Sequence, residues 1–203
     1  EKRLVQNNCW IAMVRGNHDD PAYFELQADG NTLIHHARWQ TVPDYAVIKA
    51  CGRMVLCVGG AVSVDRQIRM REMERHLGKR YYWPNETVRY DAEALDAIRD
   101  AGLQVDIVVT HTAPSICEFK SKQGLATWAQ YDATLLDDCD AERSAMDKIL
   151  VHLKHDRHPL ERWYYGHFHN SWHSEIDGVW FKMLDVTELL EVPRINNEKL
   201  SER

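Results

Sequence analysis

Three short apolar segments of this chain each end in a polar cluster that contains histidine. "CWIAMV" at residues 9–14 precedes GNHDD, "VDIVVT" at 105–110 precedes HTAPS, and "RWYY" at 162–165 precedes GHFHN. Short apolar runs bounded by polar turn residues are typical of buried strands. In open α/β sheets, side chains beyond the carboxyl ends of strands converge where ligands bind. The sequence therefore predicts an α/β fold with one site built from three distant segments.

The remaining elements support an α/β fold. Further strands are predicted at residues 45–50, 53–60 and 178–186, and helices at 91–102 and 140–155. The first two of these strands flank Cys51-Gly52 and are expected to form a hairpin. Asp91 is the expected N-cap of its helix and Gly102 its stop. Residues 63–90 are less regular, and we expect a long loop or an inserted helix and loop there.

Composition limits the size, partners and location of the protein. The chain has 203 residues, enough for a single domain spanning 1–203 with a sizeable core. A net charge of −6 argues against nucleic acid as a general partner, because phosphate backbones need a basic surface. No apolar run approaches the ~20 residues of a membrane span, so no membrane partner is expected. The five cysteines lack C-x-x-C spacing, which argues against a disulfide framework and a zinc knuckle. A reducing, cytoplasmic setting is the simplest expectation.

The polar clusters resemble three motifs of the calcineurin-like metallophosphoesterase superfamily. The matching residues are "GNHD", the strand that ends at His111, and "GHFH", in the family's order and at strand ends. The resemblance covers most of the chain and implies a four-layer α/β/β/α sandwich with two divalent metal ions. By motif, Asn17, His111 and His167 would bind one ion and His169 the other. Oxygen and imidazole ligands suit Mn, Fe or Zn.

The resemblance also implies an activity and a role for His18. The expected reaction is metal-dependent hydrolysis of a phosphoester, in which a hydroxide activated by two metal ions attacks phosphorus. His18 would lie above the metals, hydrogen-bond the phosphate and protonate the leaving oxygen, because histidine changes charge near neutral pH. The expected partner is a small phosphoester substrate. Two alternatives are a cyclic-nucleotide or nucleic-acid phosphodiesterase, and a non-catalytic scaffold of the same fold.

Two earlier motifs of the family, D-x-H and G-D-x-x-D, are missing from these residues. The sequence contains no Gly-Asp pair, and its one D-x-H, at residues 156–158, follows a predicted helix. The opening "EKRLVQNN" resembles the tail of the helix that normally follows the second motif. We therefore expect a strand–helix–strand unit before Glu1 that is truncated, lies outside the residues given, or is placed on another chain. The alternative is a naturally degenerate member of the family.

Several further residues receive a structural interpretation or stay ambiguous. Gly16 is expected to let the chain turn sharply before Asn17. Asp19 and Asp20 either orient His18 or cap a following turn. If residues 167–169 are extended, both histidines point to the same face. The other histidines are expected on the surface or in packing roles: His35, His36, His152, His155, His158 and His173. "GGAVSVDR" (59–66) and "RYYWPNE" (80–86) resemble segments of some bacterial and phage members, which indicates no substrate.

Overall fold

Two sheets form the centre of the molecule in a computed structural model that describes residues 1–76, 78–117 and 124–192. The larger sheet has the order β4-β5-β6-β7-β9-β8, in which the pairs β5–β6, β6–β7 and β7–β9 are parallel. Its strands are Ala46–Ala50 (β4), Arg53–Val58 (β5), Ile107–Thr110 (β6), Arg162–Tyr165 (β7), Trp172–Ile176 (β8) and Val179–Met183 (β9). The smaller sheet, β1-β3-β2, contains Ile11–Met13 (β1), His35–His36 (β2) and Trp39–Thr41 (β3).

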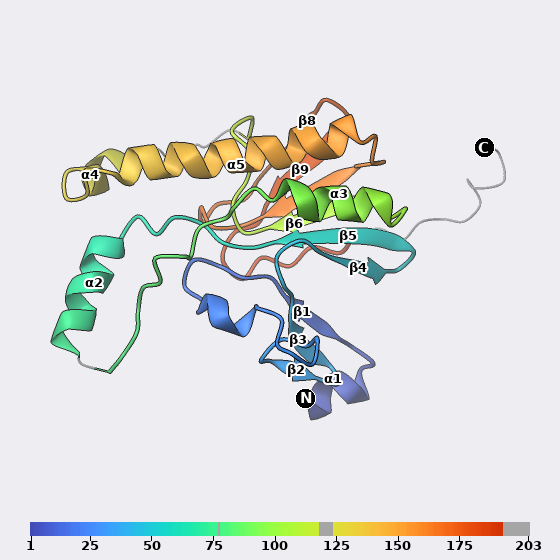
Figure 1. Cartoon of the computed structure of the whole chain (residues 1–203), viewed down its shortest axis with the longest axis horizontal. Helices are drawn as coiled ribbons and strands as arrows, with labels where there is room; N and C mark the ends of the chain where they lie inside the picture. Colours follow the sequence, from blue (N-terminus) through green and yellow to red (C-terminus); the bar gives the residue numbers. More distant parts are fainter. Residues whose placement is uncertain (77, 118–123, 193–203) are drawn as a thin grey trace.

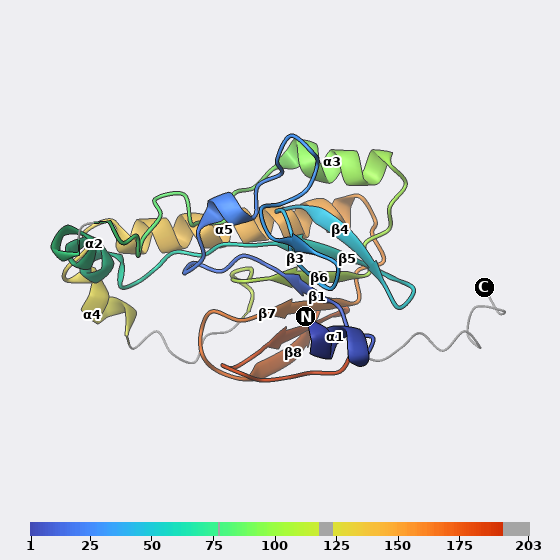
Figure 2. The ribbon, with the colours of Figure 1, turned by 90° about the horizontal axis from the view of Figure 1, so that it is seen from below.

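The helices enclose these sheets on both sides. They are Lys2–Gln6 (α1), Arg66–Arg75 (α2), Ala92–Asp100 (α3), Leu125–Ala129 (α4) and Leu135–His155 (α5), with a 3₁₀ turn at Pro21–Tyr23. Figure 1 shows α3 and α5 along one face of the six-stranded sheet, the small sheet on its other side, and α1 beyond that. Turned by 90°, Figure 2 shows the small sheet over β5 and β6. The predicted α/β sandwich is confirmed.

The main core lies between the six-stranded sheet and the α3–α5 pair. Helix α5 contributes Met146 and Ile149, which are both 0% exposed. On the sheet, Trp163 stacks on Phe181 with ring centroids 5.8 Å apart. Each large apolar side chain buried in this way contributes about 1.5–3 kcal/mol. This packing fixes the carboxyl ends of β6 and β7 next to each other.

The predicted elements are present in the structure, although their ends differ. The hairpin forms, and Cys51 and Gly52 have the positive φ angles (51° and 81°) of a tight two-residue turn. Asp91 caps α3 by accepting a hydrogen bond from the Ala94 N–H (2.9 Å). Helix α5 begins at Leu135, earlier than predicted, because that side chain is itself buried in the core. Strands β2, β3 and β8 were not predicted, and α2 occupies part of the irregular stretch 63–90.

The extent of the domain stays a prediction. The expected single domain spans residues 1–203, of which 193–203 lie outside the described residues. Within the part of the chain that the structure describes, no helix combines the length and the apolar character needed to cross a membrane.

Candidate metal centre

The five residues predicted from the sequence as metal ligands or catalytic acid line one pocket. Asn17 and His18 follow β1, His111 follows β6, and His167 and His169 follow β7. The rest of the lining comes from the ends of β6, β7 and β9: Val109, Thr110, Tyr164, Tyr165, Gly166, Leu184, Asp185 and Val186. Since β6 and β7 are neighbouring parallel strands, their carboxyl ends meet at one sheet edge. We call this pocket the strand-end site.

Asn17 and His111 make the closest contact between predicted ligands. The Asn17 Oδ1 atom lies 2.9 Å from His111 Nε2. This is a hydrogen-bond distance, and it is also the separation of two ligands held about 2.0–2.1 Å from one ion at a right angle, as in octahedral coordination. The His167 ring lies next to that of His111, with centroids 5.0 Å apart. A carboxamide oxygen and an imidazole nitrogen at this spacing, with a second imidazole ring beside them, are donors that suit a divalent transition-metal ion.

His167 and His169 occupy a bent segment, so the extended conformation assumed for them is wrong. Their φ angles are 68° and 49°, in the left-handed region that few non-glycine residues adopt. Phe168 donates its N–H to the Gly166 carbonyl (2.8 Å) and packs against the hydrophobic core. The bend thus holds an apolar side chain in the core and still leaves a histidine on each side of it in the lining of the strand-end site.

The residues around His18 stabilise its turn. Gly16 does not have a positive φ angle, and a Cβ atom added there would lie 3.2 Å from His111 Cε1. Glycine at this position therefore avoids crowding His111. The special backbone angle that we expected for a sharp turn is not present. Asp19 accepts a hydrogen bond from the Gly16 N–H (2.7 Å), and Asp20 accepts one from Ala22 (3.1 Å). Both aspartates therefore act as turn caps.

Burial keeps two of the predicted ligands, His111 and His167, neutral. It lowers the pKa of His111 to about 4, with a smaller contribution from His18. Burial, followed by the neighbouring His111, also lowers the pKa of His167 well below its ordinary value. Metal ions bind the neutral imidazole, so these shifts favour ligation at physiological pH. Although His18 is exposed at the surface, partial burial of its ring and the adjacent Arg69 lower its pKa as well.

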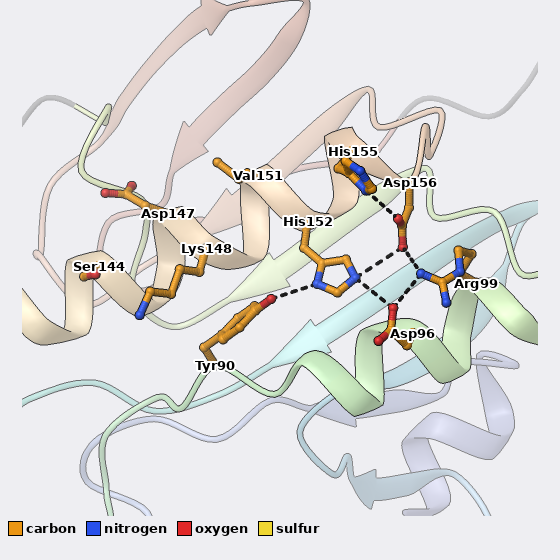
Figure 3. Close-up of a pocket in the computed structure, with 10 residues that line it drawn as sticks. All are labelled: Tyr90, Asp96, Arg99, Ser144, Asp147, Lys148, Val151, His152, His155 and Asp156. Carbon is orange, nitrogen blue, oxygen red and sulfur yellow. Dashed lines mark hydrogen bonds and ion pairs between the residues drawn. The ribbon is translucent and has the colours of Figure 1, made fainter.

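A second group with metal-ligand geometry lies elsewhere, between α3 and α5 (Figure 3). His152 Nε2 is 3.4 Å from Asp96 Oδ1 and 3.2 Å from Asp156 Oδ2. Within the described ranges, this is the one group of three His, Cys, Asp or Glu residues whose ligand atoms all lie within 4.8 Å. Arg99 already bridges its carboxylates, with Nη1 2.5 Å from Asp96 and 3.3 Å from Asp156. We call these four residues the α3–α5 cluster.

Sequence reasoning missed this cluster and one contact of the strand-end site. The four-residue spacing of His152 and Asp156 at the end of a predicted helix was a usable signal, but the position of Asp96 beside them depends on how α3 packs on α5. The missed contact is Ser63, whose Oγ accepts a hydrogen bond from Asn17 Nδ2 (2.8 Å). Ser63 lies in the segment "GGAVSVDR", where nothing local indicates a role.

Comparison with known protein families identifies the family of this chain. The sequence profile of the calcineurin-like phosphoesterases matches residues 2–171, most of the chain. The chain belongs to the calcineurin-like phosphoesterase family. The resemblance seen in the sequence is therefore confirmed, and membership supports a hydrolase that acts on phosphoesters, in a family that typically binds divalent metals. A comparison with curated proteins found no match.

Proposed function

We propose that this calcineurin-like phosphoesterase hydrolyses a small phosphoester at the strand-end site, using divalent metal held by Asn17, His111, His167 and His169. The observation that carries the proposal is that side chains from three distant segments line one pocket, with Asn17 Oδ1 2.9 Å from His111 Nε2. Lowered histidine pKa values support it, because they keep the nitrogen lone pairs free. Two ions, when bound, would activate water and neutralise charge on the phosphoryl oxygens.

His18 is the proposed general acid. Its ring lines the same pocket, and the Arg69 guanidinium lies against its Nε2 atom. Arg69 disfavours the imidazolium form of His18, because two cations in contact repel. A phosphoryl group between the two side chains would be attracted to both and would raise the pKa of His18 toward the neutral range. The substrate would then help to protonate the residue that donates a proton to its own leaving oxygen.

The experiment compares a synthetic monoester and a synthetic diester. Hydrolysis of p-nitrophenyl phosphate and bis(p-nitrophenyl) phosphate is measured with Mn²⁺, Fe²⁺ or Zn²⁺ and after treatment with a chelator, and bound metal is determined by elemental analysis. We expect hydrolysis that chelation abolishes and added metal restores. Activity on the diester with little on the monoester would identify a phosphodiesterase. Metal-independent hydrolysis would contradict the proposal, and bound metal without hydrolysis of any ester would indicate a scaffold.

A further inference from the structure

We propose that Ser63 and Glu86 orient the carboxamide of Asn17 and thereby set the affinity of the strand-end site for a divalent metal. The inference rests on the proposed function, since it concerns one of the proposed ligands. A carboxamide has an accepting oxygen and a donating nitrogen of almost the same size. Only the oxygen can bind a cation. Some contact must therefore decide which end of the Asn17 side chain faces His111.

The contacts of Asn17 make that choice. Its Nδ2 atom donates to Ser63 Oγ (2.8 Å), while its Oδ1 atom faces His111 Nε2 (2.9 Å). Asn17 is 5% exposed and Ser63 0% exposed, so their hydrogen bonds are made within the protein. Turning the amide over would place its oxygen against Ser63 Oγ and its nitrogen in the metal site.

Glu86 in turn determines the direction in which the Ser63 hydroxyl donates its hydrogen bond. The carboxylate accepts from the Ser63 N–H at Oε1 (2.7 Å) and from the Ser63 hydroxyl at Oε2 (2.9 Å). A weaker contact of the hydroxyl, to the Asn17 carbonyl, is longer (3.5 Å). Burial raises the pKa of the Glu86 carboxyl to about 7. Above that pH the ionised carboxylate only accepts hydrogen bonds, so the Ser63 hydroxyl must donate its hydrogen to Glu86. The Ser63 oxygen is then left to accept from Asn17, and a turned-over amide would leave two buried oxygens facing each other.

The loop that carries Glu86 is held close to Asn17 by a separate contact. Arg15, two residues before Asn17, donates from Nη1 to the Glu86 carbonyl (2.5 Å). Glu86 is 2% exposed and Arg15 is 4% exposed. The carboxylate therefore keeps its place relative to the strand end, as a group that positions a ligand must.

The test measures binding of Mn²⁺ alone to the purified, chelator-treated protein, from the electron paramagnetic resonance signal of free Mn²⁺. Four variants are compared with the wild type: Ser63→Ala, Glu86→Gln, Thr32→Ala and His167→Ala. Glu86→Gln keeps the side-chain volume but offers one accepting oxygen where Ser63 needs two. Thr32→Ala is the matched control, because Thr32 is also buried (7% exposed) and its hydroxyl bonds to Thr41 in the small sheet (2.8 Å), away from the site. Circular dichroism verifies that each variant is folded.

We expect Ser63→Ala and Glu86→Gln to weaken Mn²⁺ binding by about 10–100-fold, the usual effect of removing a partner of a metal ligand. Thr32→Ala should bind as the wild type does, and His167→Ala should lose binding. If both Ser63→Ala and Glu86→Gln bind Mn²⁺ as tightly as the wild type while His167→Ala does not, the inference is wrong and the proposed function stands. If the wild type binds no Mn²⁺, or His167→Ala binds it equally well, the proposed metal site fails and the inference fails with it.

Discussion

The strand-end site and the α3–α5 cluster both bring potential metal ligands together, yet they differ in charge. In the cluster, two carboxylates already share a cation, because Arg99 contacts both Asp96 and Asp156. A hydrogen bond from His155, followed by Arg99, lowers the pKa of Asp156. In the strand-end site, burial keeps the donors His111 and His167 neutral, Arg69 lies beside His18, and Asp185 is the carboxylate in the pocket lining. Ligand spacing alone therefore does not identify a metal centre, and the state of charge of the donors has to be considered with it.

The largest expected difference between the two regions is catalytic. His18→Ala should lower the rate of phosphoester hydrolysis by about 10²–10⁴-fold, the usual contribution of a general acid. His152→Ala, in the α3–α5 cluster, should leave the rate unchanged. The measurement is kcat for the ester that the wild type hydrolyses best. A His18→Ala variant as active as the wild type would remove His18 from the mechanism.

Acid stability should also separate the two regions in the metal-free protein. His111 has its pKa lowered to about 4 in the folded state, while the unfolded chain takes up the proton near its ordinary value of 6.5. Protonation of His111 therefore has no effect on stability above pH 6.5. As the pH falls from 6.5 to 4, the unfolded chain binds the proton more readily than the folded chain, and the free energy of unfolding decreases. The loss is at most about 3 kcal/mol.

His111→Asn should remove that part of the acid sensitivity. Urea unfolding of the chelator-treated protein at pH 7, 5.5 and 4.5 checks this, with His173→Asn as the control. Equal losses of stability on acidification in the wild type and in His111→Asn would contradict the burial argument.

Added metal should stabilise the fold through the strand-end site only. An ion present at 100 times its Kd raises the free energy of unfolding by about 2.7 kcal/mol. His167→Ala should abolish the rise in Tm on adding Mn²⁺, and His152→Ala should keep it. Differential scanning calorimetry with and without the ion measures both. The reverse pattern would move the metal centre to the α3–α5 cluster.

The smallest effect is expected from Arg99→Ala. Its side chain is 42% exposed, and its pairs with Asp96 and Asp100 are exposed ion pairs, which contribute little to stability. Asp156, which is 3% exposed, keeps its contacts with His152 and His155, so the change in Tm should be the least of the series. Without the guanidinium, however, Asp96 and Asp156 lose their shared cation, and we expect weak Zn²⁺ binding that the double variant Arg99→Ala/His152→Ala lacks. Isothermal titration calorimetry tests this. If Arg99→Ala gains no Zn²⁺ binding, something other than charge keeps metal out of the cluster.

The site residues at the strand ends could be predicted from the sequence because the information there is local. An apolar run, a turn and a histidine lie within a few residues of each other, and the order of the three clusters carries the family resemblance. Contacts between distant segments could not be predicted in this way. Ser63 and Glu86 are 23 residues apart and meet only through the folded loop, and Asp96 reaches His152 only because α3 packs on α5. The left-handed backbone of His167 and His169 was missed for a related reason: tertiary packing of Phe168 overrides the extended conformation that strand propensity suggests.

The left-handed backbone of His167 and His169 lowers stability at two positions that the proposed function requires to be histidine. A residue with a Cβ atom costs about 1–2 kcal/mol in this region, whereas glycine carries no such cost and asparagine a smaller one. Replacing His167 or His169 by glycine would relax the chain while removing a proposed ligand. A library of variants screened for heat resistance alone should therefore accumulate glycine or asparagine at these two positions and lose its metal, whereas a screen for hydrolysis should keep both histidines at the expense of a lower melting temperature.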